Sequence, residues 1–559
     1  MISLVRCAPA GFAVALFVLL VSPVSAVDLG ISPGSLNKNQ QDTRQYYELL
    51  KEERDDAARP VDEPVIEQEA VPVIPEPAEG ARTILITRFD VSPSEVLSAE
   101  EIAAITDKYV NRELNINQLM GVVAEINNLY ASKVQIIARA VLPKQKVSDG
   151  VIKIKLIEAR LGKVQIEGTE HTRDSYIEER ISLAPGELIR LDELTDSLIS
   201  YNRWNGMTLK ASMVPGEAYG TTDIVLLADE GKQFILNVFA DNAGRDSVGT
   251  NRLGVTAQVA SLFGYRDRLY MGATVSKGSG NAFGSYDIPV HKSGTRLGLN
   301  YDLGKIKIIQ GPLEPLNVTG DSSNLGFSLT QPIAARGDYD WDTNLAYIRK
   351  SSNSYFDGVK LVNTAADDFV LGTNLRFFDK RGTWLTSHAV TYGDSDSVKG
   401  RNYFIYTGSL TRLQYFQNGS SMIVRSRWQL ADTNDLPSFN QIIIGGTASV
   451  RGYTEGLLIG DRGYALSLEY AYPLTFVGQW AQRSNVFAFI DNGAAFPFRG
   501  DGEPQTRSED FLTSVGVGLD FDVFETVSFK VSIGVPTRNK AFYGQDDYRI
   551  NAILNWNAW

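Results

Sequence analysis

Two short stretches of this sequence contain the charged residues best placed to pair with each other. The first, Ile-Gly-Gly-Thr-Ala-Ser-Val-Arg-Gly-Tyr at 444–453, holds Arg451 between a valine and a glycine. The second, Phe-Ala-Phe-Ile-Asp-Asn-Gly at 487–493, holds Asp491 in an otherwise apolar strand pattern. An arginine at a glycine-rich loop tip suits a tight space, and it needs an anion there. We interpret the two stretches as the halves of a lock inside a membrane barrel.

The N-terminal residues indicate export. Arg6 supplies a positive start, residues 11–21 form a short apolar run, and a Val-Ser-Ala cleavage site ends the expected signal peptide, residues 1–26. The single cysteine, Cys7, lies in this segment, so no disulfide is expected in the mature chain. No later stretch has the roughly 18 apolar residues of a spanning helix, so any membrane crossing must be made by strands.

A polar helix and a proline-rich tether are predicted next. Within segment 27–59, residues 36–59 are good helix formers with few apolar side chains. Such a helix is either frayed in solvent or seated in a wet cavity, because it cannot bury a broad face. Residues 60–80 are rich in proline, valine and acid, which predicts an extended linker with no means of packing. The two segments predict a mobile helix on a tether.

The region from 81 to 231 predicts two small α+β modules in tandem, at 81–161 and 162–231. Both follow the order β-α-α-β-β, and the repeat of this order indicates two related units. Strands are predicted at 83–89, 134–142, 150–159, 164–167, 207–214 and 223–229, and helices from Ser98 and at 117–130, 174–181 and 191–202.

From residue 232 onward, apolar and polar residues alternate in glycine-rich segments. Residues 268–275 and 514–521 place apolar side chains on one side and polar residues or glycine on the other. Repeated segments of about ten residues with this pattern are typical of transmembrane barrel strands. We count about sixteen strands, an even number as bacterial barrels prefer. Residues 232–559 therefore predict a transmembrane β-barrel of antiparallel strands.

The lengths of the connections provide a second test of the barrel. If the first strand rises from the periplasm, the even-numbered connections should be short and the odd ones can be long. A soluble β-sandwich would also alternate in hydropathy, but it would not separate long and short loops so systematically. Short connections are predicted at 263–265, 291–294, 379–382 and 522–525, and long ones at 304–323, 351–367, 431–462 and 493–511. The longest, 431–462, is the sixth outer loop and contains Arg451.

An energetic argument predicts the direction of Asp491. A charge facing lipid near the bilayer centre costs roughly 2–4 kcal/mol, so Asp491 should face the lumen, together with Phe487 and Phe489. A shielded Arg-Asp pair loses roughly 3–5 kcal/mol when one partner is removed. The alternative is that Arg451 and Asp491 are two of many lumenal charges, and spacing alone does not separate these readings. The candidate lock comprises Val450, Arg451, Gly452, Tyr453, Phe487, Phe489, Asp491 and Gly493.

Four motifs resemble those of a known family and follow its order along nearly the whole mature chain. Residues 450–453 (Val-Arg-Gly-Tyr) resemble the sixth-loop arginine motif of outer-membrane transporters with polypeptide-transport-associated (POTRA) domains. Residues 489–493 resemble its partner strand motif. Residues 139–158, with Arg-Ala-Val-Leu-Pro-Lys-Gln at their start, resemble the first POTRA domain of the two-partner secretion transporters, the TpsB family. Residues 214–223 resemble the second domain.

The resemblance implies a fold and an activity. The fold is two POTRA domains and a sixteen-stranded barrel, plugged by the N-terminal helix and the sixth loop. The activity is export of a TpsA-type exoprotein, with its N-terminal secretion domain, across the bacterial outer membrane. The POTRA domains would then lie in the periplasm. The partner would add to a strand edge, with 134–142 and 207–214 as candidates, or lie in a groove beside a helix. The helix would then leave the pore and the loop would shift.

The same resemblance implies contact with outer-membrane lipid and with the barrel assembly machinery during biogenesis. The terminal Trp559 falls out of phase with the apolar face of the last strand, so the register of the usual C-terminal assembly signal departs from the family pattern. The alternative function is a barrel-assembly insertase of the same superfamily, which shares the loop motif. Such proteins usually carry more POTRA modules and lack the plug helix and linker, and a passive porin would need no such modules.

Other chemistry is disfavoured. The three histidines lie in different predicted elements without ligand spacing, so neither a metal nor another cofactor is expected. The sequence has no phosphate-cradling glycine loop with lysine and no defensible nucleophile-base set, so an enzyme is not predicted. A net charge of -12 argues against nucleic acid as partner.

Overall fold

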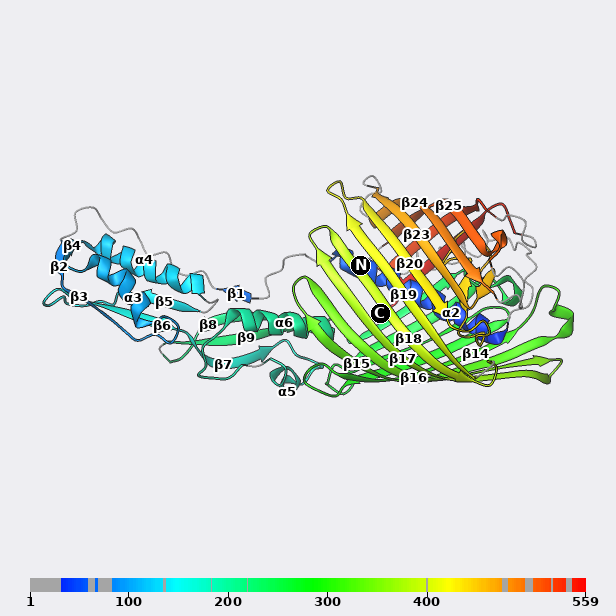
Figure 1. The fold of residues 1–559 in the computed structure, drawn as a ribbon, viewed down its shortest axis with the longest axis horizontal. Coiled ribbons are helices and arrows are strands. Elements are labelled where there is room, and N and C mark those ends of the chain that lie inside the picture. Colours follow the sequence, from blue (N-terminus) through cyan, green and yellow to red (C-terminus); the bar gives the residue numbers. More distant parts are fainter. Residues whose placement is uncertain are drawn as a thin grey trace, which may run out of the picture.

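Figure 1 presents the computed structural model, in which two small modules follow one another and lead to one end of a barrel. The structure describes residues 32–58, 66–68, 83–133, 137–181, 183–218, 220–398, 401–474, 481–497, 506–523, 526–538 and 545–559. The expected signal peptide, residues 1–26, lies outside these ranges. No helix in the described part of the chain is both long enough and apolar enough to cross a bilayer.

The first module is a three-stranded sheet covered by two helices. Its elements are β2 (Ile84–Ile86), β3 (Arg88–Val91), α3 (Ala99–Thr106), β4 (Arg112–Leu114), α4 (Ile116–Lys133), β5 (Ala138–Val141) and β6 (Val151–Glu158). β6 lies between β3 and β5, and β2 pairs separately with β4. The prediction of one strand over 83–89 is wrong, because Thr87 separates β2 from β3 and donates its N–H to the Gly150 carbonyl at 2.9 Å.

Glu158 ties the end of β6 to the turn before α3. Its carboxylate accepts hydrogen bonds from the Ser94 hydroxyl, from the Glu95 N–H at 3.0 Å and from the Tyr130 hydroxyl at 2.9 Å. Burial raises the pKa of this carboxyl, but the hydrogen bonds outweigh burial and leave the pKa below its usual value. Glu158 therefore acts as a charged clamp within the first module.

The second module repeats the design next to the barrel. Its elements are β7 (Arg160–Glu167), α5 (Asp174–Glu178), α6 (Leu191–Asn205), β8 (Thr208–Pro215) and β9 (Thr221–Asp229). α6 buries Leu194, Leu198 and Tyr201 against the sheet, and it ends at Gly206, whose φ of 62° is left-handed. Glycine adopts this conformation without strain, which ends the helix sharply.

Part of the linker belongs to the sheet of the second module, whose strand order is β1-β8-β9-β7. β1 (Ile66–Gln68) lies parallel to residues 211–213 of β8. The expectation that the linker over 60–80 packs against nothing is therefore wrong for these three residues. The physical reason is that β9 covers only one edge of β8, and the other edge presents unpaired backbone groups that an extended segment satisfies.

Polar contacts hold the second module at the mouth of the barrel. Arg266, in the turn after the second barrel strand, donates to the Asn205 carbonyl at 2.9 Å and also to the Gly206 carbonyl. Arg336, in the turn after the sixth strand, pairs with Asp196 of α6. The end of α6 is thereby fixed beside the opening of the lumen.

The C-terminal region closes into a barrel of sixteen strands, each pairing with its neighbour in an antiparallel direction. This confirms the predicted fold class. The strands are β10 (Phe234–Asp241), β11 (Arg252–Ala260), β12 (Arg268–Val275), β13 (Ser279–Pro289), β14 (Arg296–Lys307), β15 (Val318–Ala335), β16 (Tyr339–Phe356), β17 (Val359–Asp379), β18 (Gly382–Ser395), β19 (Asn402–Tyr415), β20 (Ser421–Ala431), β23 (Arg462–Pro473), β24 (Ala481–Phe496), β25 (Phe511–Val523), β26 (Val527–Pro536) and β27 (Arg549–Asn557). The described residues also form short 3-10 helices at Asp107–Tyr109, Asp246–Val248, Glu314–Leu316 and Ser508–Asp510.

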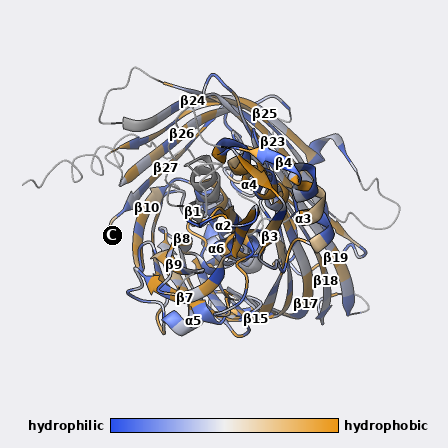
Figure 2. Ribbon diagram, turned by 90° about the vertical axis from the view of Figure 1, so that its left-hand side faces the viewer, coloured by the Kyte–Doolittle hydropathy of each residue, from blue (hydrophilic) through white to orange (hydrophobic). Residues whose placement is uncertain are grey.

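The outer surface of the barrel is apolar, as the alternation predicts. Met271 and Val275 of β12 and Val515 and Val517 of β25 are exposed large apolar side chains, whereas Ser514 is fully buried. Figure 2 shows both hydropathy colours in short alternation along the strands of the ring. A barrel with this outward apolar face suits lipid.

Two of the predicted long outer loops contain the ends of barrel strands, and one of them is largely strand. β16 and β17 continue as a hairpin through most of 351–367 and are joined by Asp357 and Gly358, whose φ values are 46° and 79°. An Asp-Gly pair with positive φ at both residues makes the tight turn that matches strand twist. In the other, β14 and β15 cover half of 304–323, at 304–307 and 318–323. The sequence pattern did not predict these strand extensions. Outside the bilayer, a polar stretch can form either a strand or a loop, so its polarity does not distinguish the two.

The N-terminal helix lies inside the barrel. α2 (Pro33–Ala58) crosses the ring in Figure 2, and its contacts reach β14, β15 and β16. Pro33 suits the first helical position, where no backbone donor is needed. Of the two placements that the sequence leaves open for this helix, the structure selects the cavity.

Candidate functional site

The sixth outer loop folds back into the lumen. β20 ends at Ala431 and β23 begins at Arg462, so loop six comprises residues 432–461. Within it, β21 (Ile442–Ile444) and β22 (Leu458–Gly460) pair as an antiparallel hairpin. Loop six and the neighbouring wall share an apolar cluster of Ile442, Ile444, Val450, Tyr453, Ala465, Ala495 and Leu512. Loop six is therefore a folded structure anchored to one side of the barrel.

The tip of loop six lies directly on the barrel wall. Gly452 has a φ of 95°, and a Cβ added there would lie 2.8 Å from the carbonyl carbon of Gly534 in β26. A Cβ added to Gly493 would lie 2.9 Å from a methyl group of Val450. Such distances leave no room for a side chain, so these glycines permit the close approach of loop and wall.

Arg451 and Asp491 form a buried, bidentate ion pair. Arg451 Nε donates to Asp491 Oδ2 at 2.8 Å, and Nη2 donates to Oδ1 at 2.9 Å. The backbone N–H of Arg451 also donates to Oδ2, at 3.0 Å. Arg451 is 4% exposed and Asp491 is fully buried. Bidentate pairs of this kind are among the strongest hydrogen-bonded contacts, and removing one partner strands the other at a cost of roughly 3–5 kcal/mol.

Glu469 of β23 is a second anion for the same arginine, and the sequence analysis did not identify it. Its carboxylate accepts from Arg451 Nη1 at 2.7 Å and from Lys530 Nζ at 3.0 Å. The signal that could have found Glu469 is the one used for Asp491. Glu469 is the one charged residue in the apolar pattern of β23 from 463 to 473, and a charge there must face the lumen.

Two aromatic rings form the floor of the ion-pair cluster. The guanidinium carbon of Arg451 lies 3.5 Å from the centre of the Phe489 ring, and Lys530 Nζ lies 4.5 Å from the centre of the Phe487 ring. Both phenylalanines are buried, as predicted for lumenal residues. Each ring covers the glycine that faces it across the strand pair, Gly516 beneath Phe489 and Gly518 beneath Phe487. The rings contribute attraction to the cations and exclude water from the pair.

Tyr453 fastens the far side of the loop tip. Its side chain is fully buried, and its hydroxyl donates to the Thr513 carbonyl of β25 at 2.9 Å. The structure thus brings together all eight residues of the candidate lock, from loop six and from one strand of the wall. Their contribution to gating stays a prediction.

Arg425 and Arg427 of β20 connect this cluster with α2. Arg427 donates to Asp42 of α2 at 3.0 Å and to the Ile443 carbonyl of loop six at 2.9 Å. Arg425 lies 4.0 Å from Glu469 and 5.8 Å from the centre of the Tyr46 ring of α2. In the sequence, Arg425 and Arg427 are not distinguished from the other charges expected in the lumen. Their position between α2 and loop six could not be predicted from the sequence, because it depends on where α2 lies in the lumen.

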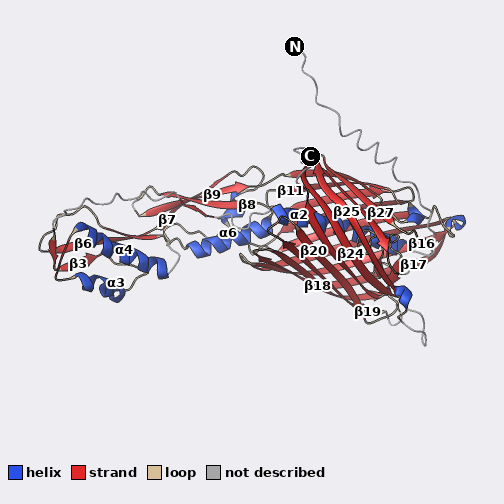
Figure 3. Ribbon diagram, turned by 90° about the horizontal axis from the view of Figure 1, so that it is seen from above, coloured by secondary structure: helices blue, strands red, loops and turns tan. Residues whose placement is uncertain are grey.

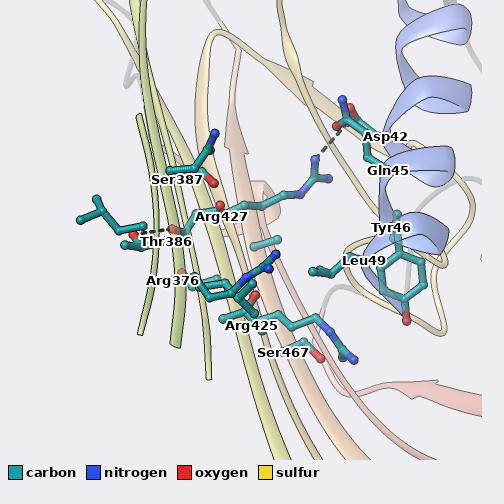
Figure 4. Close-up of a pocket in the computed structure, with 18 of the residues that line it drawn as sticks. Asp42, Gln45, Tyr46, Leu49, Arg376, Thr386, Ser387, Arg425, Arg427 and Ser467 are labelled. Atoms are coloured by element: carbon teal, nitrogen blue, oxygen red, sulfur yellow. Dashed lines mark hydrogen bonds and ion pairs between the residues drawn. The ribbon is translucent and has the colours of Figure 1, made fainter. Parts of the chain in front are cut away.

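A cavity of about 560 Å³ lies between α2, loop six and the strands β16 to β20. Figure 4 shows Arg376, Arg425 and Arg427 projecting from the wall toward Asp42 and Tyr46 of the helix. The lining also includes Arg203 and Trp204 at the end of α6. The cavity therefore connects the second module with the buried ion pair.

The described residues contain no group of three or more His, Cys, Asp or Glu side chains that is arranged to hold a metal ion. The charges of the cluster are balanced by side chains from the wall and from loop six. Such an arrangement can hold a loop, and it can release the loop when the contacts are broken.

Comparison with known proteins identifies the family. A family model described as "Haemolysin secretion/activation protein ShlB/FhaC/HecB" matches residues 220–521, and one described as "POTRA domain, ShlB-type" matches residues 84–159. The heme/hemopexin transporter protein HuxB of Haemophilus influenzae is 24% identical over 547 residues, which cover 92% of this chain and 95% of HuxB. The outer membrane transporter CdiB of Dickeya dadantii is 24% identical over 473 residues, which cover 80% and 82% of the two chains.

A solved structure has the same fold. CdiB from Escherichia coli superposes with a TM-score of 0.67 at 20% identity, over 95% of this chain and all of that one. The similarity covers the modules and the barrel together, and the family matches decide between the secretion transporter and the insertase. The chain therefore belongs to the ShlB/FhaC/HecB family of haemolysin secretion/activation proteins, the outer-membrane transporters that export a partner exoprotein and keep their POTRA domains in the periplasm.

Proposed function

We propose that the partner protein passes through the barrel lumen after α2 leaves it and the tip of loop six shifts. The observation that carries this proposal is the polar character of the contacts of α2. Asn37 bonds to Asn281 at 3.0 Å, and Gln40 bonds to Ser279 at 3.1 Å. Arg44 pairs with Asp302 at 3.1 Å. Water can replace contacts of this kind, each of which contributes only about 1 kcal/mol net.

The dimensions of α2 support the same path. A helix with its side chains is about 10–12 Å across. An extended chain is about 5 Å wide in the plane of a sheet and about 10 Å thick with its side chains. The space that α2 vacates therefore accommodates an unfolded polypeptide.

Loop six has a different role in this proposal, because its contacts are stronger. The ion pair of Arg451 with Asp491 and Glu469 is buried, and an apolar cluster backs it. We propose that loop six keeps the lumen narrow in the resting state and that the barrel wall itself does not open.

The domain assignment follows from this view. Residues 1–26 direct export, 27–59 contain the plug, 60–80 tether it, 81–161 and 162–231 recognise the partner, and 232–559 provide the pore. The partner is a TpsA-type exoprotein with an N-terminal secretion domain. Outer-membrane lipid surrounds the exposed apolar band, and the barrel assembly machinery inserts the chain.

The plug is tested by single-channel conductance in planar lipid bilayers. Deleting residues 33–58 should raise the conductance several-fold, because the helix no longer fills the lumen. The matched control replaces Arg44, Asp42 and Gln40 by alanine, which keeps the helix but removes its lumenal contacts and should give intermittent openings. Equal conductance of the deletion variant and the parent would overturn the plug.

Recognition is tested with a candidate partner, such as a large exported protein if the neighbouring reading frame encodes one. Its N-terminal domain should bind the full chain in a pull-down and should lose binding when residues 83–229 are removed. Binding retained by the bare barrel would place recognition elsewhere.

A further inference from the structure

A second cavity, of about 360 Å³, lies where the second module meets the barrel. Figure 3 shows α6 running from the second module to the near end of the barrel. The walls of the cavity come from α6, from residues 292–294 in the turn between β13 and β14, and from residues 333–336 at the end of β15. We call it the junction cavity, because it forms only when the module and the barrel are assembled.

A nearly buried arginine lines the junction cavity. The side chain of Arg180, shortly after α5, is 8% exposed, and its guanidinium carbon lies 3.6 Å from the centre of the Tyr176 ring. Nη1 donates to the Tyr176 carbonyl at 3.0 Å, and Nη2 donates to the His291 carbonyl of the barrel turn at 3.2 Å. Nε is buried and has no hydrogen-bond partner among the described residues. Most buried donors are paired, so the cation at this junction is incompletely satisfied.

The other polar groups of the junction cavity are mostly hydrogen-bond donors. Lys292 is exposed in the barrel turn, and its ammonium group pairs with no other described residue. Arg336 lines the opposite side, where it pairs with Asp196 of α6. Ser197 and Ser200 of α6 add two hydroxyl groups. Two elements of the barrel and one helix of the module thus direct donors toward the same space.

The charge balance of the junction cavity is positive. Its cations are Arg180, Lys292 and Arg336, and the carboxylates beside them are Asp196 and Glu179, the latter 3.7 Å from Arg180. Three cations against two carboxylates leave one positive charge. A phosphodiester carries one negative charge, and arginine, lysine and hydroxyl groups are the usual partners of phosphate oxygens.

The junction cavity lies at the edge of the apolar band of the barrel. Ile333 lines the cavity and is 47% exposed, and Val290, directly before the turn, is 50% exposed. Leu297 of β14 and Leu329 of β15 are paired residues and are 49% and 39% exposed. These exposed side chains form an apolar strip that ends at the cationic cavity. A ligand that suits both parts has an anionic head and hydrocarbon chains.

We propose that the junction cavity binds the phosphate group of an anionic phospholipid from the periplasmic leaflet, while its acyl chains lie along the apolar strip. The lipid thereby becomes a bridge between the second module and the barrel. This inference goes beyond the proposed function and does not depend on the departure of α2. Free phosphate offers the same oxygens but has no use for the apolar strip, so the experiment compares the two.

The probe is phosphatidylglycerol, added to the full-length protein in neutral detergent and followed by native mass spectrometry. One molecule per chain should be retained under conditions that remove the remaining lipid. Diacylglycerol with the same chains has no phosphate and should be retained at least tenfold less. Inorganic phosphate in tenfold excess over the lipid should displace none of it. Displacement by inorganic phosphate would assign the cavity to free phosphate and overturn the lipid.

Two variants address the site from different sides. Lys292→Gln removes the unpaired cation and should lower retention of phosphatidylglycerol about fivefold, whereas Lys292→Arg should retain it. Ser200→Leu fills the cavity without changing its charge and should lower retention to a similar extent. The matched control is Lys380→Gln, because Lys380 is an exposed lysine in another periplasmic turn and does not line the junction cavity. Heat-modifiable migration on gels should show a folded barrel in every variant.

The outcomes decide the inference without reference to transport. Parental retention by both Lys292→Gln and Ser200→Leu overturns the site, as does equal retention of diacylglycerol and phosphatidylglycerol. An equal loss in Lys380→Gln would show that the lipid adsorbs to any basic turn, and it would also overturn the site. Since conductance is not measured, a failure of the plug in planar bilayers leaves these results unchanged.

Discussion

Arg427 of the barrel wall and Asp42 of the plug helix are joined by an ion pair of 3.0 Å inside the lumen. The same guanidinium also donates to the Ile443 carbonyl of loop six at 2.9 Å. One side chain therefore contacts both occupants of the lumen. Departure of α2, as proposed above, would take the anion from Arg427 and so change the support of loop six.

Replacing Arg427 by glutamine should therefore loosen both occupants. The expected result is at least a threefold rise in the frequency of channel openings in planar bilayers, because the charge that holds Asp42 is lost. Asp42→Asn should reproduce the rise, since it removes the other half of the pair. Arg427→Lys, which keeps the charge, should open less often than Arg427→Gln, and identical behaviour of all three variants and the parent would contradict this link.

Breaking the buried pair should stop export. Arg451→Ala, Asp491→Asn and Glu469→Gln should each reduce secretion of the partner at least tenfold, because each removes one charge from the buried cluster that holds the tip of loop six. The loss is expected to be largest for Arg451→Ala, which strands Asp491 at a cost of roughly 3–5 kcal/mol. Secretion is measured as the partner released into the medium. Heat-modifiable migration on gels, a property of folded barrels, should be retained.

The control for these variants is Arg349→Ala. Arg349 pairs with Asp367 at 3.8 Å on the outside of the barrel, where their side chains are 65% and 40% exposed. Exposed pairs contribute about 0–1 kcal/mol, so secretion should stay at the parental level. If Arg349→Ala and Arg451→Ala lower secretion equally, the effect comes from the barrel in general and not from the buried pair.

The close contact between the tip of loop six and the barrel wall predicts that adding a single methyl group to the wall reduces secretion. Gly534→Ala should displace the tip of loop six, because the added Cβ would lie 2.6 Å from the Gly452 nitrogen. We expect secretion to fall about as far as in Arg451→Ala, with an assembled barrel. Gly284→Ala is the matched control on another barrel strand, since a Cβ there meets nothing within 4 Å; a parental phenotype for Gly534→Ala would show that the tip has room.

The junction between the second module and the barrel should depend on pH through Glu230. Its carboxylate accepts from the N–H groups of Glu170, His171 and Thr172 at 3.2, 2.8 and 2.7 Å. Burial raises the pKa of this carboxyl, but these hydrogen bonds outweigh burial and lower the pKa below its usual value. The stabilisation is therefore complete above about pH 4.3, the ordinary pKa of glutamate, and is lost as the pH falls through the lowered pKa.

Hydrogen exchange of the Thr172 amide measures this effect. Between pH 7 and 5, protection in the parent should be constant after correction for intrinsic exchange, and it should fall at lower pH. Glu230→Gln should reduce protection by roughly 1–3 kcal/mol at neutral pH, because a charged acceptor is lost, and its protection should no longer fall with acid. An acid response equal to that of the parent in Glu230→Gln would assign the response to another group.

The lumenal direction of Asp491 could be predicted from the sequence because a charge that faces lipid is energetically costly. Asp491 lies in an apolar strand, where a charge is tolerated only if it faces the lumen, so its direction could be derived without coordinates. The buried face of α4, from Leu119 to Tyr130, could also be predicted, because its apolar residues recur at helical spacing. The lumenal direction of Glu469 could have been predicted in the same way, because it too is a charge in an apolar strand.

The remaining features depend on contacts between segments that are distant in the chain. Nothing near Ile66 shows that this residue adds a strand to β8, because the open edge that attracts it belongs to residues 211–213. Arg427 has the appearance of any lumenal charge until α2 is placed beside it.

The sequence by itself determined the class of the protein: the alternation that requires a barrel in lipid, the tandem modules, the polar helix, and Arg451 and Asp491 as candidates for a pair. These features follow from local patterns, since a residue's position in a strand or helix determines whether its side chain faces lipid, water or the core. Only the tertiary structure decided that the helix occupies the lumen, that Glu469 and Arg427 join the pair to it, and that the linker caps the second module. Those relationships depend on which surfaces meet when the barrel closes, and closure brings together residues whose separation in sequence carries no signal.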